Sequence, residues 1–149
     1  MNIGSNKAIL LVEDNPDDQV LLKRAMKKNH LANEIVVAND GVEALDYLFG
    51  TGAFESRDTS LQPELVLLDL KLPKMDGHDV LRAMRADPRT KYIPVVVLTS
   101  SVEEADMIRS YDLGANSFVQ KPIDFEEFVE AAANLGLYWL VLNKPVNGK

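Results

Sequence analysis

The sequence contains no cysteine, which excludes disulfide frameworks, cysteine-ligated zinc and thiol catalysis. Long apolar runs are also missing: the longest, Leu135–Leu142, contains a glycine and is far too short to cross a bilayer. The segment Met1–Lys7 lacks the apolar core of a signal peptide. We therefore expect a soluble, cytoplasmic protein with no membrane partner.

Basic residues are in the minority, with 16 Lys and Arg against 23 Asp and Glu, a formal net charge of −7. Such an acidic surface repels phosphate backbones, so nucleic acid is not an expected partner. The two histidines, His30 and His78, have no partners at ligand spacing, and we interpret them as surface residues. Hydrophobic residues make up 46% of the chain, which excludes intrinsic disorder. Its 149 residues are the size of one globular domain.

Short apolar runs recur along the chain and lack the alternation of half-exposed strands, as in parallel strands covered on both faces. The runs are Ala8–Val12, Ile35–Ala38, Leu65–Leu68, Val95–Leu98 and Ser117–Val119.

Helix-start signals separate these runs. Asn15-Pro16 opens a helix to about Lys28, and a short helix is expected over Gly77–Arg85. Capping boxes open the other three helices, at Asp40 with Glu43, Ser101 with Glu104, and Asp124 with Glu127. Strand and helix thus alternate five times, which predicts an α/β fold, (βα)5, with a parallel sheet between helices. The segment Gly50–Pro63 is the one long loop expected.

Polar side chains gather where the predicted strands end. Glu13-Asp14 follows the first strand, Asp69 the third, Thr99-Ser100 the fourth and Lys121-Pro122 the fifth. Ligands of open parallel sheets bind beyond the carboxyl ends of the strands, so these groups are expected to converge. Three acids packed together repel one another unless a cation neutralises them. Oxygen ligands without His or Cys favour Mg²⁺, or Mn²⁺, and a carboxylate beside such a cation can form an acyl phosphate.

Each signal also has a simpler interpretation. Glu13-Asp14 before Asn-Pro could be solvated loop acids or helix-start charges. Asp69 or Thr99 could cap a helix, and Lys121 alone is most often a surface lysine. The signals are stronger together, because all of them fall at the same edge of the sheet.

In combination and order, these motifs resemble the receiver domain of two-component response regulators. The resembling segments run from about residue 7 to residue 135 and are Ile9–Asn15, Leu67–Gly77, Val97–Ser100 and Phe118–Pro122. The resemblance implies a single receiver domain over 1–149, with a five-stranded doubly wound sheet in the flavodoxin-like order 2-1-3-4-5. It also implies a phosphorelay function, with a phosphoryl group accepted from a histidine kinase, in a signalling domain and not an enzyme.

The resemblance assigns a role to each site residue. Asp69 matches the phosphoacceptor, Asp14 the direct Mg²⁺ ligand, and Glu13 the neighbouring acid that acts through metal-bound water. Lys71 matches the position whose backbone carbonyl completes the metal shell. The remaining matches are Thr99, the switch hydroxyl, Phe118, the switch aromatic, and Lys121, which pairs with the phosphate. Two departures are minor: Glu13 replaces the commoner aspartate, and Phe118 lacks the hydroxyl of tyrosine.

Two features narrow the resemblance to the stand-alone regulators that partner cyanobacterial phytochromes. The loop Gly50–Pro63 is longer than usual, and residues 135–149 extend the last helix. Beyond Asn134 this helix would be apolar almost all round, which predicts a homodimer through the C-terminal helix.

Two other functions compete with a signalling receiver. One is a magnesium-dependent phosphatase of the haloacid dehalogenase type, but such enzymes carry a second acid where this chain has Lys71. The other is a scaffold that keeps the fold without phosphorylation. It is disfavoured because all five groups of a receiver site are present: Glu13, Asp14, Asp69, Thr99 and Lys121.

Overall fold

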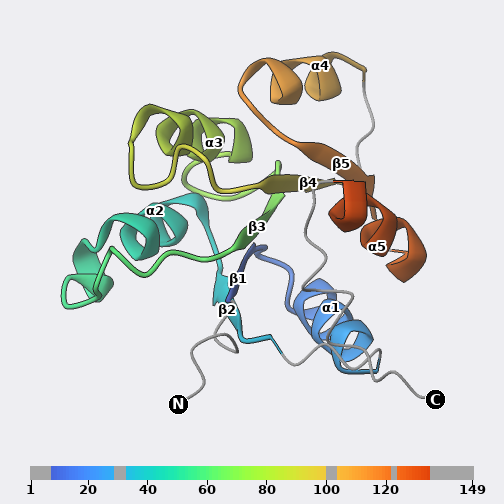
Figure 1. The fold of residues 1–149 in the computed structure, drawn as a ribbon, viewed down its shortest axis with the longest axis horizontal. Coiled ribbons are helices and arrows are strands. Elements are labelled where there is room, and N and C mark those ends of the chain that lie inside the picture. Colours follow the sequence, from blue (N-terminus) through green and yellow to red (C-terminus); the bar gives the residue numbers. More distant parts are fainter. Residues whose placement is uncertain (1–7, 29–32, 100–103, 122–123, 135–149) are drawn as a thin grey trace.

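A computed structural model describes residues 8–28, 33–99, 104–121 and 124–134 (Figure 1). Five parallel strands form one sheet in the order β2-β1-β3-β4-β5, which confirms the predicted topology. The strands are β1 (Ile9–Val12), β2 (Ile35–Ala38), β3 (Leu65–Asp69), β4 (Val95–Thr99) and β5 (Ser117–Gln120). The helices are α1 (Pro16–Lys28), α2 (Gly41–Phe49), α3 (Gly77–Ala86), α4 (Glu104–Asp112) and α5 (Phe125–Asn134), with a short 3₁₀ turn η2 (Gly52–Phe54).

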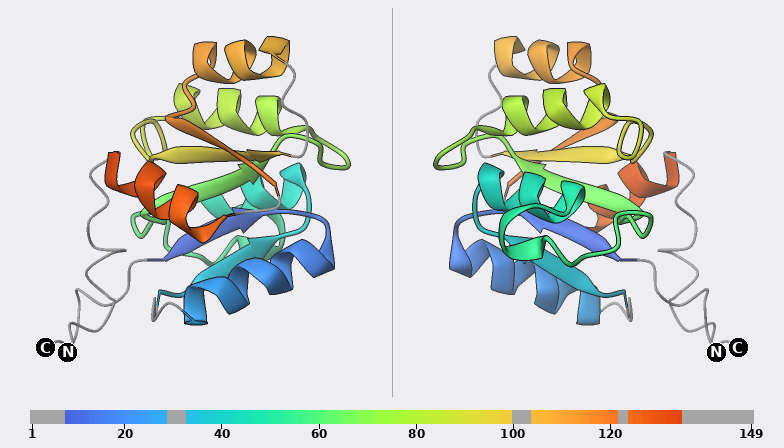
Figure 2. Two further views of the ribbon diagram at one scale, coloured as in Figure 1. Left: turned by 90° about the vertical axis from the view of Figure 1, so that its right-hand side faces the viewer. Right: turned by 90° about the vertical axis from the view of Figure 1, so that its left-hand side faces the viewer.

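Helices cover both faces of the sheet, as Figure 2 shows from its two sides. Leu22 and Met26 of α1 pack with Phe128 of α5 against one face. On the other face, α2 and α3 contribute a second apolar cluster that includes Leu48 and Met84. Because both faces are buried at the centre of the sheet, the central strands carry continuous apolar runs, and every residue of β1 and β3 is buried.

The predicted helix starts are confirmed where the structure describes them. The Asn15 side chain accepts hydrogen bonds from the backbone N–H groups of Asp17 and Asp18, and the Asp40 side chain accepts one from Glu43. Glu43 itself accepts from the N–H of Asn39, one residue before the cap. Ser100, Ser101, Pro122, His30 and the C-terminal extension over 135–149 lie outside the described residues.

The prediction that His78 is a surface residue is wrong. Its residue is 5% exposed, and its Nε2 lies 3.1 Å from Oγ of Ser110. His78 belongs to α3 and Ser110 to α4, so the side chain is buried between two consecutive helices of the chain. Among the described residues, no helix is long and apolar enough to span a membrane.

The predicted loop Gly50–Pro63 is held against α2 by Arg57. Its guanidinium lies 3.9 Å from the centre of the Tyr47 ring and donates to the carbonyls of Tyr47 and Leu61. A third bond reaches Gln62, whose own amide donates to the carbonyl of Leu48. The loop is therefore an ordered cover for the end of α2.

Candidate functional site

The site lies at the carboxyl edge of the sheet, and strand pairing sets where its residues stand. Asp69 and Thr99 are the last residues of β3 and β4 and do not follow the strands, because backbone pairing continues through them. Glu13 and Asp14 follow β1, and Lys121 follows β5. Gly77 lets α3 begin directly above Asp69, since an added Cβ would collide with the Asp69 carbonyl oxygen.

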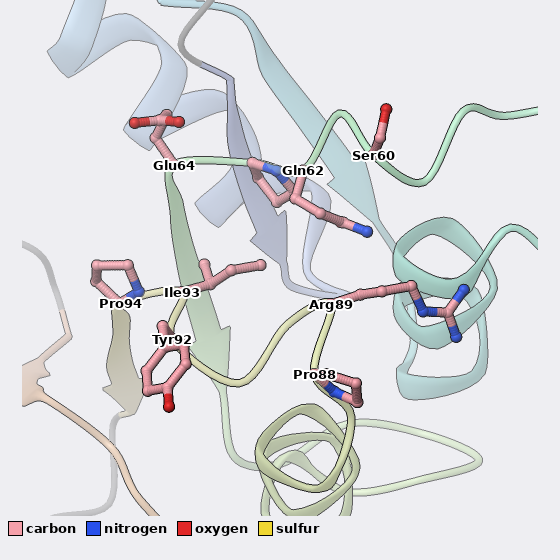
Figure 3. Close-up of a pocket in the computed structure, with 9 residues that line it drawn as sticks. Ser60, Gln62, Glu64, Pro88, Arg89, Tyr92, Ile93 and Pro94 are labelled. Carbon is pink, nitrogen blue, oxygen red and sulfur yellow. The ribbon is translucent and has the colours of Figure 1, made fainter.

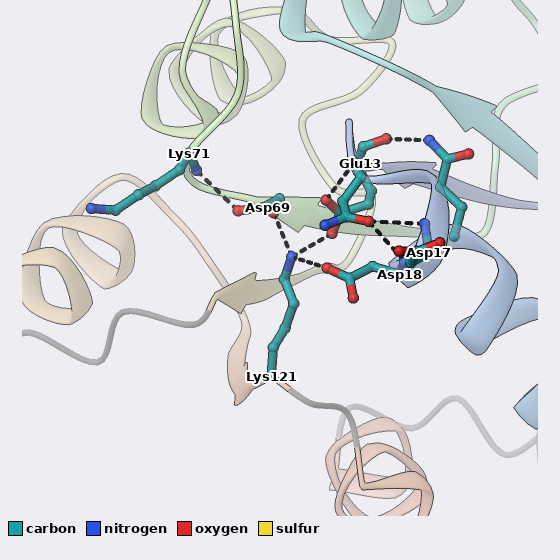
Figure 4. A network of polar contacts seen from close by, with 8 residues as sticks. Glu13, Asp17, Asp18, Asp69, Lys71 and Lys121 are labelled. Atoms are coloured by element: carbon teal, nitrogen blue, oxygen red, sulfur yellow. Dashed lines mark hydrogen bonds and ion pairs between the residues drawn. The ribbon is translucent and has the colours of Figure 1, made fainter.

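The ammonium of Lys121 is the centre of this cluster (Figure 4). Its Nζ lies 2.6 Å from Oε1 of Glu13, 2.7 Å from Oδ2 of Asp69 and 2.9 Å from Oδ2 of Asp18. An ammonium has three N–H donors, so these carboxylates satisfy its full donor capacity. The predicted convergence of Glu13, Asp69 and Lys121 is thus observed.

The backbone fixes the two buried carboxylates in place. The N–H of Lys71 donates to Oδ1 of Asp69 over 3.0 Å, and the N–H of Asn15 donates to Oε2 of Glu13 over 3.1 Å. The Lys71 side chain points away from the cluster (Figure 4). Both carboxylates therefore keep one oxygen on the backbone and present the other to Lys121.

Burial and charge change the ionisation of this cluster. Glu13 is only 2% exposed, and burial raises its pKa from 4.5 to about 7, although the hydrogen bond from Lys121 opposes the rise. Burial alone would lower the pKa of Lys121, but hydrogen bonds to Asp69, Glu13 and Asp18 hold it above its ordinary value. Lys121 is therefore a permanent positive charge beside Asp69 at neutral pH.

Glu13, Asp14 and Asp69 also form a candidate cation site. One carboxylate oxygen from each lies within 4.8 Å of the others, and Asp14 is exposed to solvent. Three hard oxygen donors, two of them buried, suit a divalent cation that keeps open positions for water or phosphoryl oxygens. The surrounding hollow has a volume of about 430 Å³ and also includes Asn15, Asp18, Lys71 and Lys121.

The two predicted switch residues, Thr99 and Phe118, lie on neighbouring strands, β4 and β5. Thr99 is paired with Gln120 in the sheet register. Phe118 on β5 is half-buried, and its ring centre lies 6.5 Å from that of Tyr111 on α4. The aromatic side chain thus lies at a contact between β5 and α4.

Sequence reasoning missed Asp18 and Gln19. Asp18 supplies the third carboxylate to Lys121, and Gln19 donates to the carbonyl of Glu13 and to the side chain of Asn39. For Asp18 the sequence did offer a signal. It falls four positions after Asp14, in the first turn of the helix that begins at the site.

A second hollow of about 410 Å³ lies at the opposite edge of the sheet, before β3 and β4 (Figure 3). Its lining includes Pro63, Pro88, Pro94 and the exposed Tyr92, with Glu64 and Arg89 as its charged residues. It lacks the convergent carboxylates and ammonium of the first hollow. We therefore place the chemistry at the carboxyl edge.

Known proteins resemble this chain over most of its length. Response regulator Rcp1 of Synechocystis sp. is 38% identical over 134 residues, which cover 90% of this chain and 89% of Rcp1. The structure of the bacteriophytochrome response regulator AtBRR matches with a TM-score of 0.81 and 53% identity, over 90% of this chain and 95% of that one.

Two further solved structures show the states in which such proteins have been observed. The Mn²⁺-bound form of Rcp1 matches with a TM-score of 0.74 and 37% identity, over 90% of this chain and 94% of that one. The phosphorylated cyanobacterial phytochrome response regulator RcpA matches with a TM-score of 0.75 and 38% identity, over 91% and 94%. The profile of the response regulator receiver domain matches residues 9–133 of this sequence, and the chain belongs to that family.

Proposed function

We propose that this receiver domain acts in a phosphorelay and accepts a phosphoryl group on Asp69. The observation that carries the proposal is the Asp69 carboxylate, 5% exposed, with one oxygen 2.7 Å from Nζ of Lys121 and the other on the backbone N–H of Lys71. A phosphohistidine of a sensor kinase is the proposed donor: its N–P bond breaks as an Asp69 O–P bond forms, which yields an acyl phosphate. The freed imidazole then takes up a proton.

The chain's own residues prepare this transfer. Lys121 offers positive charge to phosphoryl oxygens, and the Lys71 N–H keeps Asp69 oriented. Glu13, Asp14, Asp69 and the backbone carbonyl of Lys71 would hold Mg²⁺, which neutralises charge on the transferring group. The Mn²⁺-bound relative supports a divalent cation here.

The proposed donor is a phytochrome-type histidine kinase in the cytoplasm. This follows from the relatives named as phytochrome or bacteriophytochrome response regulators. We further propose that Thr99 and Phe118 transmit phosphorylation to a partner-binding surface or to a homodimer through the C-terminal helix. The phosphatase of haloacid dehalogenase type is not favoured, because Lys71 points away from Asp69 and the family match is to receivers.

The test is intact-mass measurement after incubation with acetyl phosphate and Mg²⁺. We expect one phosphoryl group per chain, removed by hydroxylamine. Asp69→Asn should gain none, because an amide does not attack phosphorus, whereas Asp76→Asn, at the start of α3, should still be labelled. Stoichiometric labelling of folded Asp69→Asn would show that the acceptor is wrong.

The metal and the switch are tested separately. Asp14→Asn should weaken Mg²⁺ affinity because it removes one charge from the cluster, and Asp17→Asn, outside the cluster, is its control. Unchanged affinity would make Glu13-Asp14 a solvated loop. Thr99→Ala should be phosphorylated without a change in partner affinity, while Lys121→Ala should impair both steps.

The dimer is tested by sedimentation of the full chain and of a chain truncated after Asn134. We expect the full chain to be a dimer and the truncated chain to be a monomer. Both should still accept a phosphoryl group on Asp69. A full-length chain that stays monomeric at about 100 μM, phosphorylated or not, would refute the dimer, since interfaces of standard size associate well below that concentration.

A further inference from the structure

Asp18 is the one partner of Lys121 that the proposed chemistry leaves unused. The ammonium donates to carboxylates from three different elements, at the end of β1, the end of β3 and the first turn of α1 (Figure 4). Glu13 and Asp69 belong to the candidate cation cluster, and Asp18 does not. The arrangement therefore gives Lys121 one anchor that is independent of the cation.

The cation and the ammonium draw on the same oxygens. A divalent cation among Glu13, Asp14 and Asp69 attracts their lone pairs and repels the positive charge of Lys121. This competition matters before the transfer, when the cation is bound and Asp69 does not yet carry phosphoryl oxygens that could accept from Lys121. Without another carboxylate, the long lysine side chain would be free to leave the site.

The position of Asp18 is itself fixed by the start of α1. Its backbone N–H donates to Oδ1 of Asn15, whose own N–H donates to Oε2 of Glu13. The Asp18 side chain is 33% exposed and that of Lys121 is 14% exposed, so the ion pair lies at the mouth of the hollow. An anchor there holds the ammonium beside Asp69 without occupying the reacting position.

We propose that Asp18 is a positioning residue for Lys121, which keeps the ammonium beside Asp69 when the cation occupies the other carboxylates before phosphoryl transfer. This inference rests on the proposed phosphorylation of Asp69. Asp18 touches neither the phosphoryl group nor the cation in this scheme and acts only through Lys121.

The chain offers a matched control in Asp17. It carries the same charge in the same helical turn, and its side chain makes none of the three contacts to Lys121. Any effect through the helix dipole or the net charge should therefore appear in both Asp17→Asn and Asp18→Asn.

The experiment measures the rate of phosphorylation by acetyl phosphate at saturating Mg²⁺ in the full chain. We expect Asp18→Asn to be slower by about tenfold, because misplacing a charged group in a site by about 1 Å costs up to about a hundredfold. Asp17→Asn should stay within about twofold, because a charge in an exposed first helical turn contributes little. Asp18→Glu should recover part of the rate.

The second arm repeats Asp18→Asn in a Lys121→Ala background. If Asp18 acts through Lys121, the double variant should be no slower than Lys121→Ala alone. Equal slowing in both backgrounds, or equal rates for Asp18→Asn and Asp17→Asn, would overturn the inference while the wild type is still labelled. A wild type that gains no phosphoryl mass would overturn the proposed function and this inference together.

Discussion

Replacing Glu13 by glutamine should stabilise the metal-free protein far more at pH 8 than at pH 5. Glutamine keeps an oxygen for the hydrogen bond from Lys121 but carries no charge, so it avoids the cost of burying a carboxylate that is 2% exposed. The folded protein binds the Glu13 proton more tightly than the unfolded chain, because burial raises the pKa from 4.5 to about 7. Proton binding by Glu13 therefore stabilises the folded state of the wild type. This stabilisation is full below pH 4.5 and is lost as the pH rises through 7.

The size of the effect follows from that difference. A tenfold change in proton affinity corresponds to about 1.4 kcal/mol, so a pKa that rises from 4.5 to about 7 amounts to about 3 kcal/mol. Most of this develops between pH 5 and pH 8. We expect the variant to gain about 2–3 kcal/mol relative to the wild type over that interval.

The assay is urea unfolding in EDTA at pH 5 and pH 8, with Glu55→Gln as an exposed control that should show no such difference. Excess Mg²⁺ should reduce the stability difference between Glu13→Gln and the wild type at pH 8, because a bound cation favours the ionised carboxylate of the wild type. If Glu13→Gln shifts stability equally at both pH values, or lowers it at pH 8, burial of a charged Glu13 is not what limits stability.

Three further predictions concern the fold and are read by the same unfolding assay. Gly77→Ala should lower the free energy of unfolding by about 2–3 kcal/mol, because the added Cβ would collide with the backbone of Asp69. A loss below about 0.5 kcal/mol would contradict this close packing. Arg85→Lys should lower the free energy of unfolding by about 1–3 kcal/mol, because one ammonium cannot replace a guanidinium that donates to several backbone carbonyls. An unchanged stability would show that these carbonyls do not need the guanidinium. Lys74→Asn should leave the free energy of unfolding unchanged or raise it by up to about 1 kcal/mol, since Lys74 has a φ of 68° and its side chain, which pairs with Asp40, is 67% exposed. A clear loss of stability would show that the ion pair matters more than the backbone.

The central strands β1, β3 and β4 were predictable because they are buried on both faces. A run such as Leu65–Leu68 needs no knowledge of its neighbours to be identified, and parallel pairing then brings all strand ends to one edge. The convergence of Glu13, Asp69 and Lys121 follows from topology in the same way. The roles assigned to these residues came from resemblance and stay predictions.

Side-chain contacts between different elements were not predictable. His78 looked like a surface residue because its own helix gives no sign that α4 lies beside it. The pairing of Asp18 with Lys121 joins residues 103 positions apart, and a helix-start acid is ordinarily explained by the helix dipole alone. Likewise, nothing near Arg57 in the sequence indicates that it folds a loop onto the ring of Tyr47.

The placement of Lys121 has a consequence for how the chain reaches its native state. Glu13 and Lys121 are 108 positions apart, so a growing chain displays its acids long before their counter-charge is synthesised. The lysine follows β5, which stands last in the order of the sheet and pairs with β4. A nascent chain that has completed β1 to β4 therefore holds uncompensated carboxylates at the carboxyl edge. If Lys121 assists the transfer as we propose, an incompletely made chain accepts the phosphoryl group more slowly than the finished protein.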